Sequence, residues 1–547
     1  MTSLSLLFHT VRHLRVKQIV YRLLMRIREI RITPTPAPAL AIWSASWNAP
    51  TYKLQSLFPP VEFSLLNETH AITTSADWDR PEWSQLWRYN LHYFDDLDSI
   101  DAQTRHTLQQ QWIQRWIAEN PAPRGTGWDA YPLSLRIVNW IKWGASGGSL
   151  DQCALDSLAL QTRVLAQKLE YHLLANHLFV NAKALIFSGA RFAGPEADAW
   201  MRKGLAILDD ELHEQFLADG AHFELSPMYH CALLWDLLDM LYLARISGNI
   251  HLQAKEKEWR VVASRALSWM NAMCLGDDQI SFFNDAAFDI APEPRVVREY
   301  ASLLEVQATP QKVSNPVDMT MQRLADSGYV RIDWPDATAI LDVARVGANY
   351  QPGHAHADTL SFELSLGSQR VFVNTGTSQY GTNSERQRQR GTAAHTTVII
   401  DDFDSSEVWA GFRVARRAYP IGYAEDCAND HVRVTCAHNG FMRLRGSPIH
   451  RRTWDARAKT ITVTDQISGK FRRAQARYHL HPDLRAAIDS DVAILVLPDE
   501  RSITVQAEGG TMALEASTWH PKFGVSCPTL CLTVTFSGPQ VTVTAHW

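Results

Sequence analysis

The sequence predicts an α+β protein in which a helical domain is followed by an antiparallel β-sandwich. Up to about residue 304, apolar residues recur at spacings of three and four, which is the pattern of amphipathic helices. Beyond about residue 316, the pattern changes to short alternating runs rich in Val, Ile and Thr, which is typical of a sandwich. A chain of 547 residues is also too long for one ordinary core, so we expect two domains or more.

Composition and charge narrow the class of protein. The 46% hydrophobic and 20% charged residues are typical of a globular protein. A net charge of −5 is small for this length and excludes a general attraction to nucleic acid, so an acidic substrate would need locally concentrated positive charge. The seven cysteines are scattered, which indicates free thiols rather than a disulfide framework.

Residues 1–42 are predicted to form a basic amphipathic helix, from Met1 to about Ile30, and a Pro-rich linker at Thr33–Pro38. Apolar and basic residues interleave throughout the helix, whereas a secretory signal places its basic residues first. We therefore expect no cleavable signal, no membrane span, and a cytoplasmic or inner-membrane-associated location in a bacterium rather than a periplasmic one. Two interpretations stay open: the helix lies on an anionic membrane surface, or it docks on its own protein.

Residues 43–308 are predicted to form the helical domain. Successive antiparallel helices make either a solenoid or a closed α/α toroid, and periodicity does not choose between them. The strongest helical segments are Leu133–Trp143, Leu155–Leu174, Ala197–Phe216, Cys231–Ile246 and Trp259–Cys274.

Residues 309–547 are predicted to form the β-sandwich, after a linker at Thr309–Asn315. The expected strands are Gly328–Ile332, Ala337–Arg345, Thr359–Leu366, Arg370–Asn374, Thr396–Ile400, His431–Ala437, Thr460–Ile467, Val492–Leu497 and Leu530–Phe536.

A polar run enters one of these strands. If Gly353–Leu364 is extended, alternate residues share a face, and His354 and His356 point with the following apolar residues toward a cleft wall. His395 leads into another strand in the same way. A His pair from two strands of one sheet, joined by an oxygen ligand such as Asn374, would make a plausible zinc site.

Two motifs in the helical half carry polar groups that must find partners or line a cavity. Asn176 and His177 lie in an otherwise apolar helix. Ser226 and the proline after it fit an N-cap and first helical position, which places Tyr229 and His230 in the first turn of the next helix.

Aromatic rings with guanidinium groups nearby are what an acidic sugar requires. The candidates for such contacts are Arg88, Tyr89, Trp128, Tyr131 and Arg136 in the helical half and Tyr380 and Arg390 in the β half.

The order of these motifs resembles the heparinase II/III-like polysaccharide lyases. The resemblance covers about residues 80 to 400 and rests on an Asn-His helix, a Ser-Pro-x-Tyr-His helix start, a Gly-His-x-His-x-Asp strand and an Arg-Gly-x-x-x-His-x-x-Val segment. It implies an incomplete (α/α) toroid packed on an antiparallel β-sandwich. It also implies cleavage of a uronic-acid-containing polysaccharide by β-elimination.

The resemblance also implies roles for residues. Asn176, with His177, would neutralise the uronate carboxylate that opposes removal of the C5 proton. Tyr229 or His354 would take that proton, and Tyr229 would protonate the leaving oxygen; the stereochemistry of the uronate decides which is the base. His230 is a second-choice participant.

The elimination requires no cofactor, but the resemblance implies that His356 and His395 hold a structural divalent metal, Zn²⁺ or Ca²⁺. The family commonly has Asp where this chain has Asn374, which is a poorer ligand for a cation.

Two other functions stay open. A glycoside hydrolase needs two flanking carboxyl groups, for which Asp129, Glu224, Asp285 and Asp358 are available. A non-catalytic sugar-binding component of polysaccharide assembly needs no such carboxyl groups. A role in bacterial exopolysaccharide metabolism would suit a lyase with a basic N-terminal helix, and the oligomeric state is not predicted.

Overall fold

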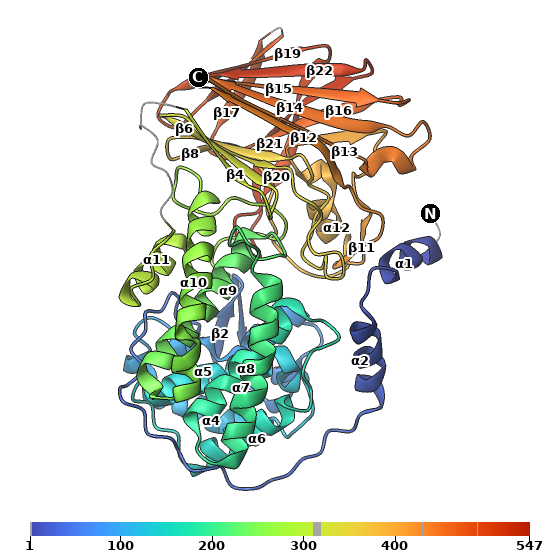
Figure 1. Cartoon of the computed structure of the whole chain (residues 1–547). Helices are drawn as coiled ribbons and strands as arrows, with labels where there is room; N and C mark the ends of the chain where they lie inside the picture. The colour runs from blue at the N-terminus through green and yellow to red at the C-terminus, as the bar shows by residue number, and fades with distance from the viewer. Residues whose placement is uncertain (1–2, 310–318, 429, 490) are drawn as a thin grey trace.

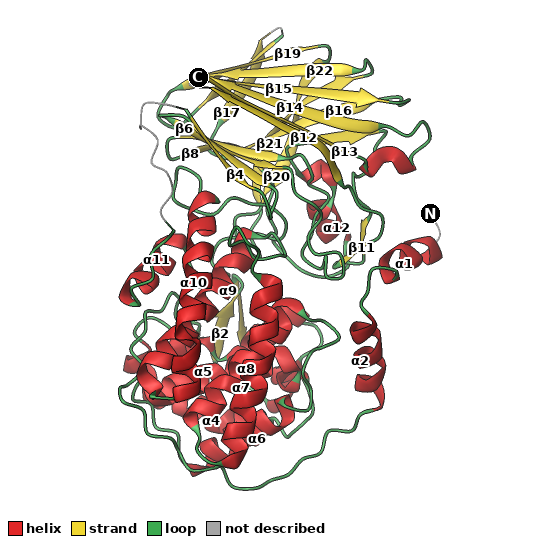
Figure 2. Cartoon of the chain, in the orientation of Figure 1, coloured by secondary structure: helices red, strands yellow, loops and turns green. Residues whose placement is uncertain are grey.

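The computed structural model describes residues 3–309, 319–428, 430–489 and 491–547. The helices and the sheets form two separate bodies stacked end to end (Figure 1), which Figure 2 shows by secondary structure. This confirms the predicted fold class, a helical domain followed by an antiparallel β-sandwich. The linker predicted at Thr309–Asn315 lies, beyond its first residue, outside the described residues.

The helical domain also contains a small three-stranded antiparallel sheet that the sequence did not predict. Its strands are β1 (Leu57–Phe58), β2 (Glu62–Leu65) and β3 (Glu68–Ala71). The helices are α3 (Gln85–Tyr93), α4 (His106–Glu119), α5 (Ala130–Ala145), α6 (Gln152–Leu165), α7 (Ala175–Arg191), α8 (Pro195–Gln215), α9 (Pro227–Ser247), α10 (Ile250–Ala272) and α11 (Pro294–Leu303). The 3-10 helices are η1 (Ser75–Asp79), η2 (Asp95–Asp98), η3 (Ala102–Arg105) and η4 (Thr126–Trp128).

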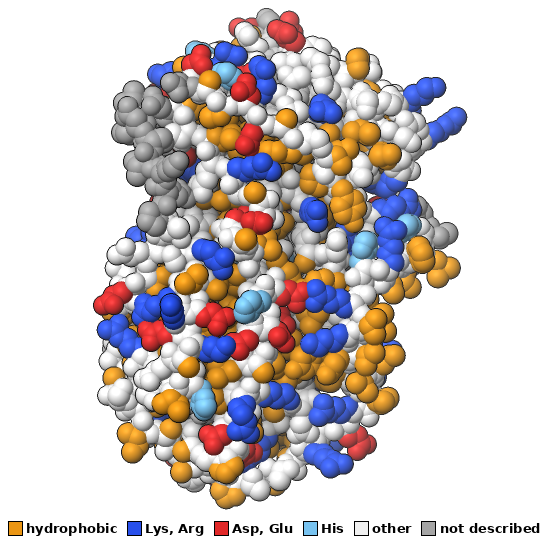
Figure 3. Space-filling view, viewed as in Figure 1, with side chains coloured by type: hydrophobic (Ala, Val, Ile, Leu, Met, Phe, Trp, Pro, Cys, Tyr) orange, Lys and Arg blue, Asp and Glu red, His pale blue; other side chains and the backbone are white. Residues whose placement is uncertain are grey.

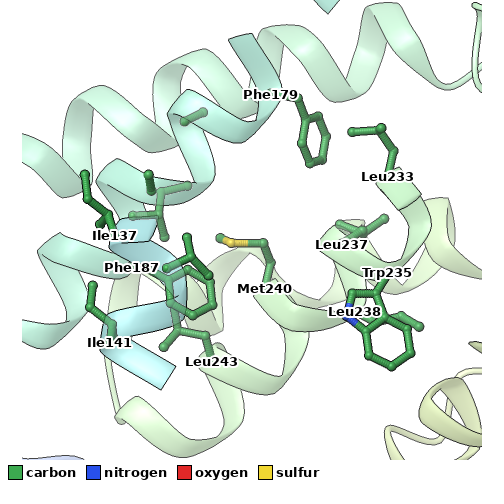
Figure 4. Close-up of a cluster of buried hydrophobic side chains, with 14 of the residues drawn as sticks. Ile137, Ile141, Phe179, Phe187, Leu233, Trp235, Leu237, Leu238, Met240 and Leu243 are labelled. Atoms are coloured by element: carbon green, nitrogen blue, oxygen red, sulfur yellow. The ribbon is translucent and has the colours of Figure 1, made fainter. Parts of the chain in front are cut away.

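Helices α5, α7 and α9 meet in the core of this domain. Figure 4 shows side chains from the three helices pointing toward one another, among them Ile137, Phe187 and Met240. All three are fully buried, and burial of one such side chain contributes about 1.5–3 kcal/mol. The core therefore fixes the N-terminal ends of α7 and α9, which carry the predicted site residues.

One helix is shorter than predicted. The sequence predicts Leu155–Leu174, but α6 ends at Leu165. The chain then turns through short-range backbone bonds, such as Leu173 N–H to the Glu170 carbonyl, and Leu174 adopts a positive φ of 65° before α7 begins. Leu169 and Leu174 continue the apolar pattern through this turn and are buried, which is why periodicity extended the helix.

The β domain is a sandwich of two antiparallel sheets. One has the order β12-β13-β14-β15-β22-β19-β18-β17, and the other β20-β21-β16-β8-β7-β6-β5-β4, with β9 also paired to β16. Strands of the first are β12 (Pro420–Ala428), β13 (His431–His438), β14 (Ile449–Arg457), β15 (Thr460–Ser468), β17 (Arg485–Asp489), β18 (Val492–Val496), β19 (Ser502–Glu508) and β22 (Gln540–His546). Strands of the second are β4 (Thr320–Leu324), β5 (Tyr329–Asp333), β6 (Ala337–Asp342), β7 (Phe362–Leu366), β8 (Gln369–Val373), β9 (Val398–Ile400), β16 (Ala474–Leu480), β20 (Thr511–Trp519) and β21 (Cys527–Phe536).

The inner faces of both sheets supply the sandwich core. In β14 buried and less buried residues alternate, so that Trp454 points inward. Its ring meets that of Phe362 from β7 with the centroids 6.4 Å apart. The segment between β8 and β12 contains α12 (Ser384–Arg390), η5 (Thr392–Ala394) and the hairpin of β10 (Val408–Trp409) and β11 (Arg413–Val414), and η6 (Gly440–Arg443) follows β13.

The polar run before β7 is not a strand, which corrects the prediction for Gly353–Leu364. Strand β7 begins only at Phe362, and Leu360 adopts a positive φ of 66° that a strand cannot contain. The loop bonds to the helical domain instead, because the Asn284 side chain accepts from His356 N–H and the Asp358 carboxylate accepts from Asn284 N–H, both at 3.1 Å. The domain interface therefore shapes this loop.

The N-terminal segment forms two helices rather than the predicted single one. They are α1 (Ser3–Val11) and α2 (Val16–Ile27), and Figure 1 shows both on the same side of the molecule. Residues 28–39, which include the predicted Pro-rich linker, then form no helix or strand. Within the described ranges, no helix combines the length and apolar character needed to cross a membrane.

Candidate active site

A buried carboxylate from the helical domain joins two imidazoles of the β domain. His354 Nδ1 donates to Asp285 Oδ2 at 2.9 Å, and His356 Nε2 donates to Asp285 Oδ1 at 2.8 Å. Arg386 donates to both oxygens of the same carboxylate, at 2.7 Å to Oδ2. Burial alone would raise the pKa of Asp285, but Arg386 and the two imidazoles outweigh it and hold that pKa well below its usual range. Asp285 is therefore an ionised anchor between the domains.

The anchor fixes the orientation and tautomer of His354. With Nδ1–H donated to Asp285, the neutral ring presents Nε2 as a proton acceptor. This nitrogen lies 3.7 Å from Glu224 Oε2, and the ring lies over that of Tyr229 with 3.9 Å between centroids. The same Asp–His arrangement orients general bases in other enzymes.

Tyr229 lies in the first turn of α9, as the cap motif predicts. The Ser226 hydroxyl accepts from Tyr229 N–H at 3.2 Å and donates to the Asp285 carbonyl at 2.5 Å, which ties the helix start to the anchor. The phenol oxygens of Tyr229 and Tyr380 are hydrogen-bonded at 2.8 Å. Burial, together with Tyr380, raises the pKa of Tyr229 well above its usual value, so the phenol keeps its proton at neutral pH.

Asn176 and His177 lie in the first turn of α7 and act on Glu224. Burial raises the pKa of Glu224, while His354, His177 and the Asn176 backbone N–H act in the opposite direction, so all three influence one carboxyl. Asn176 is 3% exposed, and its Oδ1 has no hydrogen-bond partner among the described residues. Neither carboxyl oxygen of Glu224 has a close hydrogen bond there either, so the Asn176 N–H and the imidazoles act on it from farther away, as His354 Nε2 does at 3.7 Å. Buried acceptors of this kind are expected to meet a ligand or water.

His177 is held by a carboxylate. Its Nδ1 lies 3.1 Å from Glu170 Oε1, and its ring lies against Tyr131 with 4.6 Å between centroids. Burial alone would lower the pKa of His177, but the Glu170 carboxylate outweighs it and raises that pKa. His177 therefore favours positive charge beside Asn176, as a uronate carboxylate requires.

Two predicted participants lie in the protein core. His230 is fully buried, with Nδ1 accepting from His222 N–H at 3.1 Å and Nε2 bonded to the Ala266 carbonyl at 2.9 Å. Arg136 is also fully buried, and its guanidinium donates to Gln161 and to two backbone carbonyls. Neither placement leaves a group for substrate, which corrects both predictions.

The remaining predicted sugar contacts divide between the core and the surface. Trp128 is buried and donates to the Asn120 carbonyl, and Arg390 is buried and donates twice to the Ala355 carbonyl, so neither is free to meet a sugar. Arg390 thereby holds the loop that carries His354. Arg88 and Tyr89 are partly exposed on α3, bonded to Asp79 and Asp129, and stay predictions as sugar contacts.

The predicted metal ligands come together as a hydrogen-bonded chain. His356 Nδ1 and His395 Nε2 lie 3.3 Å apart, while Asn374 Oδ1 lies 3.2 Å from the other ring nitrogen of His395. The amide oxygen is therefore not directed at the gap between the imidazoles, and three donors do not converge. Within the described residues no group of three or more His, Cys, Asp or Glu could hold an ion. The donor set does not fit the predicted structural metal.

Sequence reasoning missed the anchoring role of Asp285 and named no role for Arg386. These two residues lie 101 positions apart and form their ion pair only when the domains meet. Asp285 and Glu224 were considered only as carboxyl groups for a hydrolase. The Asp285 carboxylate is committed to Arg386 and both imidazoles, so it cannot act as the protonated acid that a hydrolase needs.

Comparison with known proteins identifies the class to which this fold and site belong. The model of the heparinase II/III N-terminus matches residues 48–312, and the model of the heparinase II/III-like C-terminal domain matches residues 317–547. The chain belongs to the heparinase II/III-like family.

Individual relatives match this chain at low sequence identity. A heparin-sulfate lyase of Pedobacter heparinus is 26% identical over 245 residues, covering 42% of this chain and 36% of the relative. FtsZ-localized protein C of Caulobacter vibrioides is 24% identical over 330 residues, covering 57% of this chain and 54% of the relative. The matches thus span about half the length of such relatives or less. The crystal structure of heparinase III has the same fold, with a TM-score of 0.67, 17% identity, and coverage of 86% of this chain and 79% of that one.

Proposed function

We propose that this protein is a lyase that cleaves a uronic-acid-containing polysaccharide by β-elimination. The observation that carries the proposal is that Asn176 and His177 from the helical domain and His354 from the β domain all act on Glu224, while the ring of Tyr229 lies over that of His354. Membership of the heparinase II/III-like family supports it. As the polymer that contains this uronate, we propose a bacterial exopolysaccharide.

In this mechanism Asn176 and the cationic His177 neutralise the uronate carboxylate. His354 Nε2 takes the C5 proton, and the electron pair of that C–H bond forms the C4–C5 double bond as the C4–O bond breaks. Tyr229 gives its phenol proton to the leaving oxygen. The proton on His354 then returns to Tyr229, whose ring lies 3.9 Å away between centroids, and the cycle closes.

The raised pKa of Tyr229 and the hydrogen bond made by His354 Nδ1 support Tyr229 as the acid and His354 as the base. A phenol whose pKa is raised holds its proton and enters the reaction as a donor. An imidazole whose Nδ1–H is given to a carboxylate has Nε2 free to accept. A donor aimed at developing charge, as Asn176 would be, is typically worth about 10²–10³ in rate.

Products formed from a panel of polyuronides test the function. Heparin-like, alginate-like and capsular polymers are each incubated with the full chain, and products are separated and examined by mass spectrometry. We expect at least one polymer to give oligosaccharides ending in an unsaturated uronate. Saturated products with new reducing ends would support a hydrolase instead, and binding without any product would support a sugar-binding component.

The pH dependence of the reaction tests the role of Glu170. In Glu170→Gln the carboxylate that raises the pKa of His177 is gone, so we expect the basic limb of the kcat/KM profile to move to lower pH. Glu211→Gln is a matched control, because Glu211 is also a buried glutamate but bonds to Gln215 on α8. Identical basic limbs for wild type and Glu170→Gln would contradict the role.

A further inference from the structure

The two N-terminal helices present their apolar sides to solvent. In α1 the exposed side chains are spaced three and four apart, and in α2 they follow the same rule, so each set forms one face. These side chains, here called the outward stripe, are each 41% to 78% exposed: Leu4, Leu7, Phe8, Val11, Val16, Ile19, Val20, Leu23, Leu24 and Ile27. A helix docked on its own protein normally buries this face.

The inner side of the helices attaches through polar contacts. Gln18 is 2% exposed and donates to the Tyr350 carbonyl at 3.2 Å. Arg15 forms an ion pair with Glu214 and lies over the Tyr350 ring at 3.7 Å. In α1, the Thr10 hydroxyl accepts from the Trp409 indole at 3.1 Å. The arrangement therefore holds both helices in place with the outward stripe facing away.

The segment that carries the outward stripe is strongly basic. Residues 3–31 contain a single acidic residue, Glu29, and the following basic ones: Arg12, Arg15, Lys17, Arg22, Arg26, Arg28 and Arg31. Figure 3 shows hydrophobic side chains gathered along the right edge of the view, over α1 and α2, with Lys and Arg side chains among them. An exposed apolar face bordered by positive charge is the pattern of helices that lie in a membrane interface.

We propose that α1 and α2 bind the protein to the surface of an anionic lipid bilayer. The outward stripe enters the boundary between headgroups and acyl chains, and exposed arginines of the same segment, Arg22, Arg26 and Arg28, meet the lipid phosphates. The excess of positive charge favours a negatively charged surface over a second copy of this chain, whose own stripe is equally basic. Binding is peripheral, because each helix is too short to span. The proposal does not depend on the lyase reaction.

Co-sedimentation of the full chain with vesicles tests the proposal. We expect binding to phosphatidylglycerol–phosphatidylcholine vesicles, weaker binding at high salt, and little binding to phosphatidylcholine alone. The variant Leu23→Glu/Ile27→Glu should reduce affinity by about a hundredfold or more, because two anchors are lost and two negative charges are added. Both residues are exposed, so folding should be retained, which circular dichroism and thermal unfolding check.

The control variant Ile42→Glu/Ile250→Glu changes two exposed isoleucines outside α1 and α2 and adds the same charge. It should bind nearly as wild type does. The proposal is overturned if wild type does not sediment with anionic vesicles, or if the two variants lose binding equally. It is also overturned if wild type is a dimer without lipid and Leu23→Glu/Ile27→Glu makes it monomeric, since a second copy would then cover the outward stripe.

Discussion

Tyr229→Phe should lower the kcat of uronate elimination by about 10²–10⁴ while leaving the fold unchanged, because it removes the proton given to the leaving oxygen. The change deletes one hydroxyl whose partner is the Tyr380 phenol, and both rings are only partly buried. Initial rates of unsaturated-product formation, measured on the polymer that wild type cleaves best, give the ratio. The melting temperature shows whether the fold is retained.

Tyr423→Phe provides the matched control for this measurement. Tyr423 lies on β12 and bonds to Glu425, so its loss removes a phenol from a strand of the eight-stranded sheet that carries none of the site residues. Its rate should equal that of wild type. If the rate of Tyr229→Phe lies within about threefold of that of the control, Tyr229 does not donate the proton to the leaving oxygen.

Asp285→Ala should lower the free energy of unfolding by about 3–5 kcal/mol, the cost of leaving a buried charge without its partner. The guanidinium of Arg386 is fully buried and would face the two imidazoles without the carboxylate. The effect depends on pH in a defined direction. Because the pKa of Asp285 in the folded protein lies below its ordinary 3.8, its stabilisation is present above that pH and is lost as the pH falls through the lowered value.

Urea unfolding at neutral pH measures this loss, and Asp289→Ala is the control. Asp289 pairs with Lys522 where both side chains are about half exposed, and such pairs contribute about 0–1 kcal/mol. The same preparation should be inactive, since His354 loses the group that orients it. If Asp285→Ala were no less stable than Asp289→Ala, the anchor between the domains would not have the role described.

The architecture could be predicted because it depends on local patterns. Apolar spacing locates α8, α9 and α10, and the Ser226–Pro227 cap places Tyr229 in the first turn of α9. Where a buried connection continues the apolar pattern, as after Leu165, spacing overestimates the helix. In the N-terminal segment it identified the amphipathic character but not the break between α1 and α2.

The site could be predicted only in part, because its organising contact spans the chain. The alternation rule placed His354 and His356 together through a strand that does not exist, yet both rings meet Asp285 from a loop. Nothing near Asp285 or Arg386 in the sequence indicates their pairing. Residue type likewise suggested Arg136 and Trp128 as sugar contacts. Both side chains are buried, which residue type does not reveal, so neither can contact a sugar.

The most direct test of the account compares one variant from each domain. The near-ultraviolet absorbance of an unsaturated uronate is followed for wild type, Asn176→Ala and His354→Ala on the same polymer. We predict a steady rise for wild type and a loss of about 10²-fold or more for each variant, because the helical and β domains complete one site. No rise with any polyuronide, or full rates in either variant with the fold intact, would contradict the proposal.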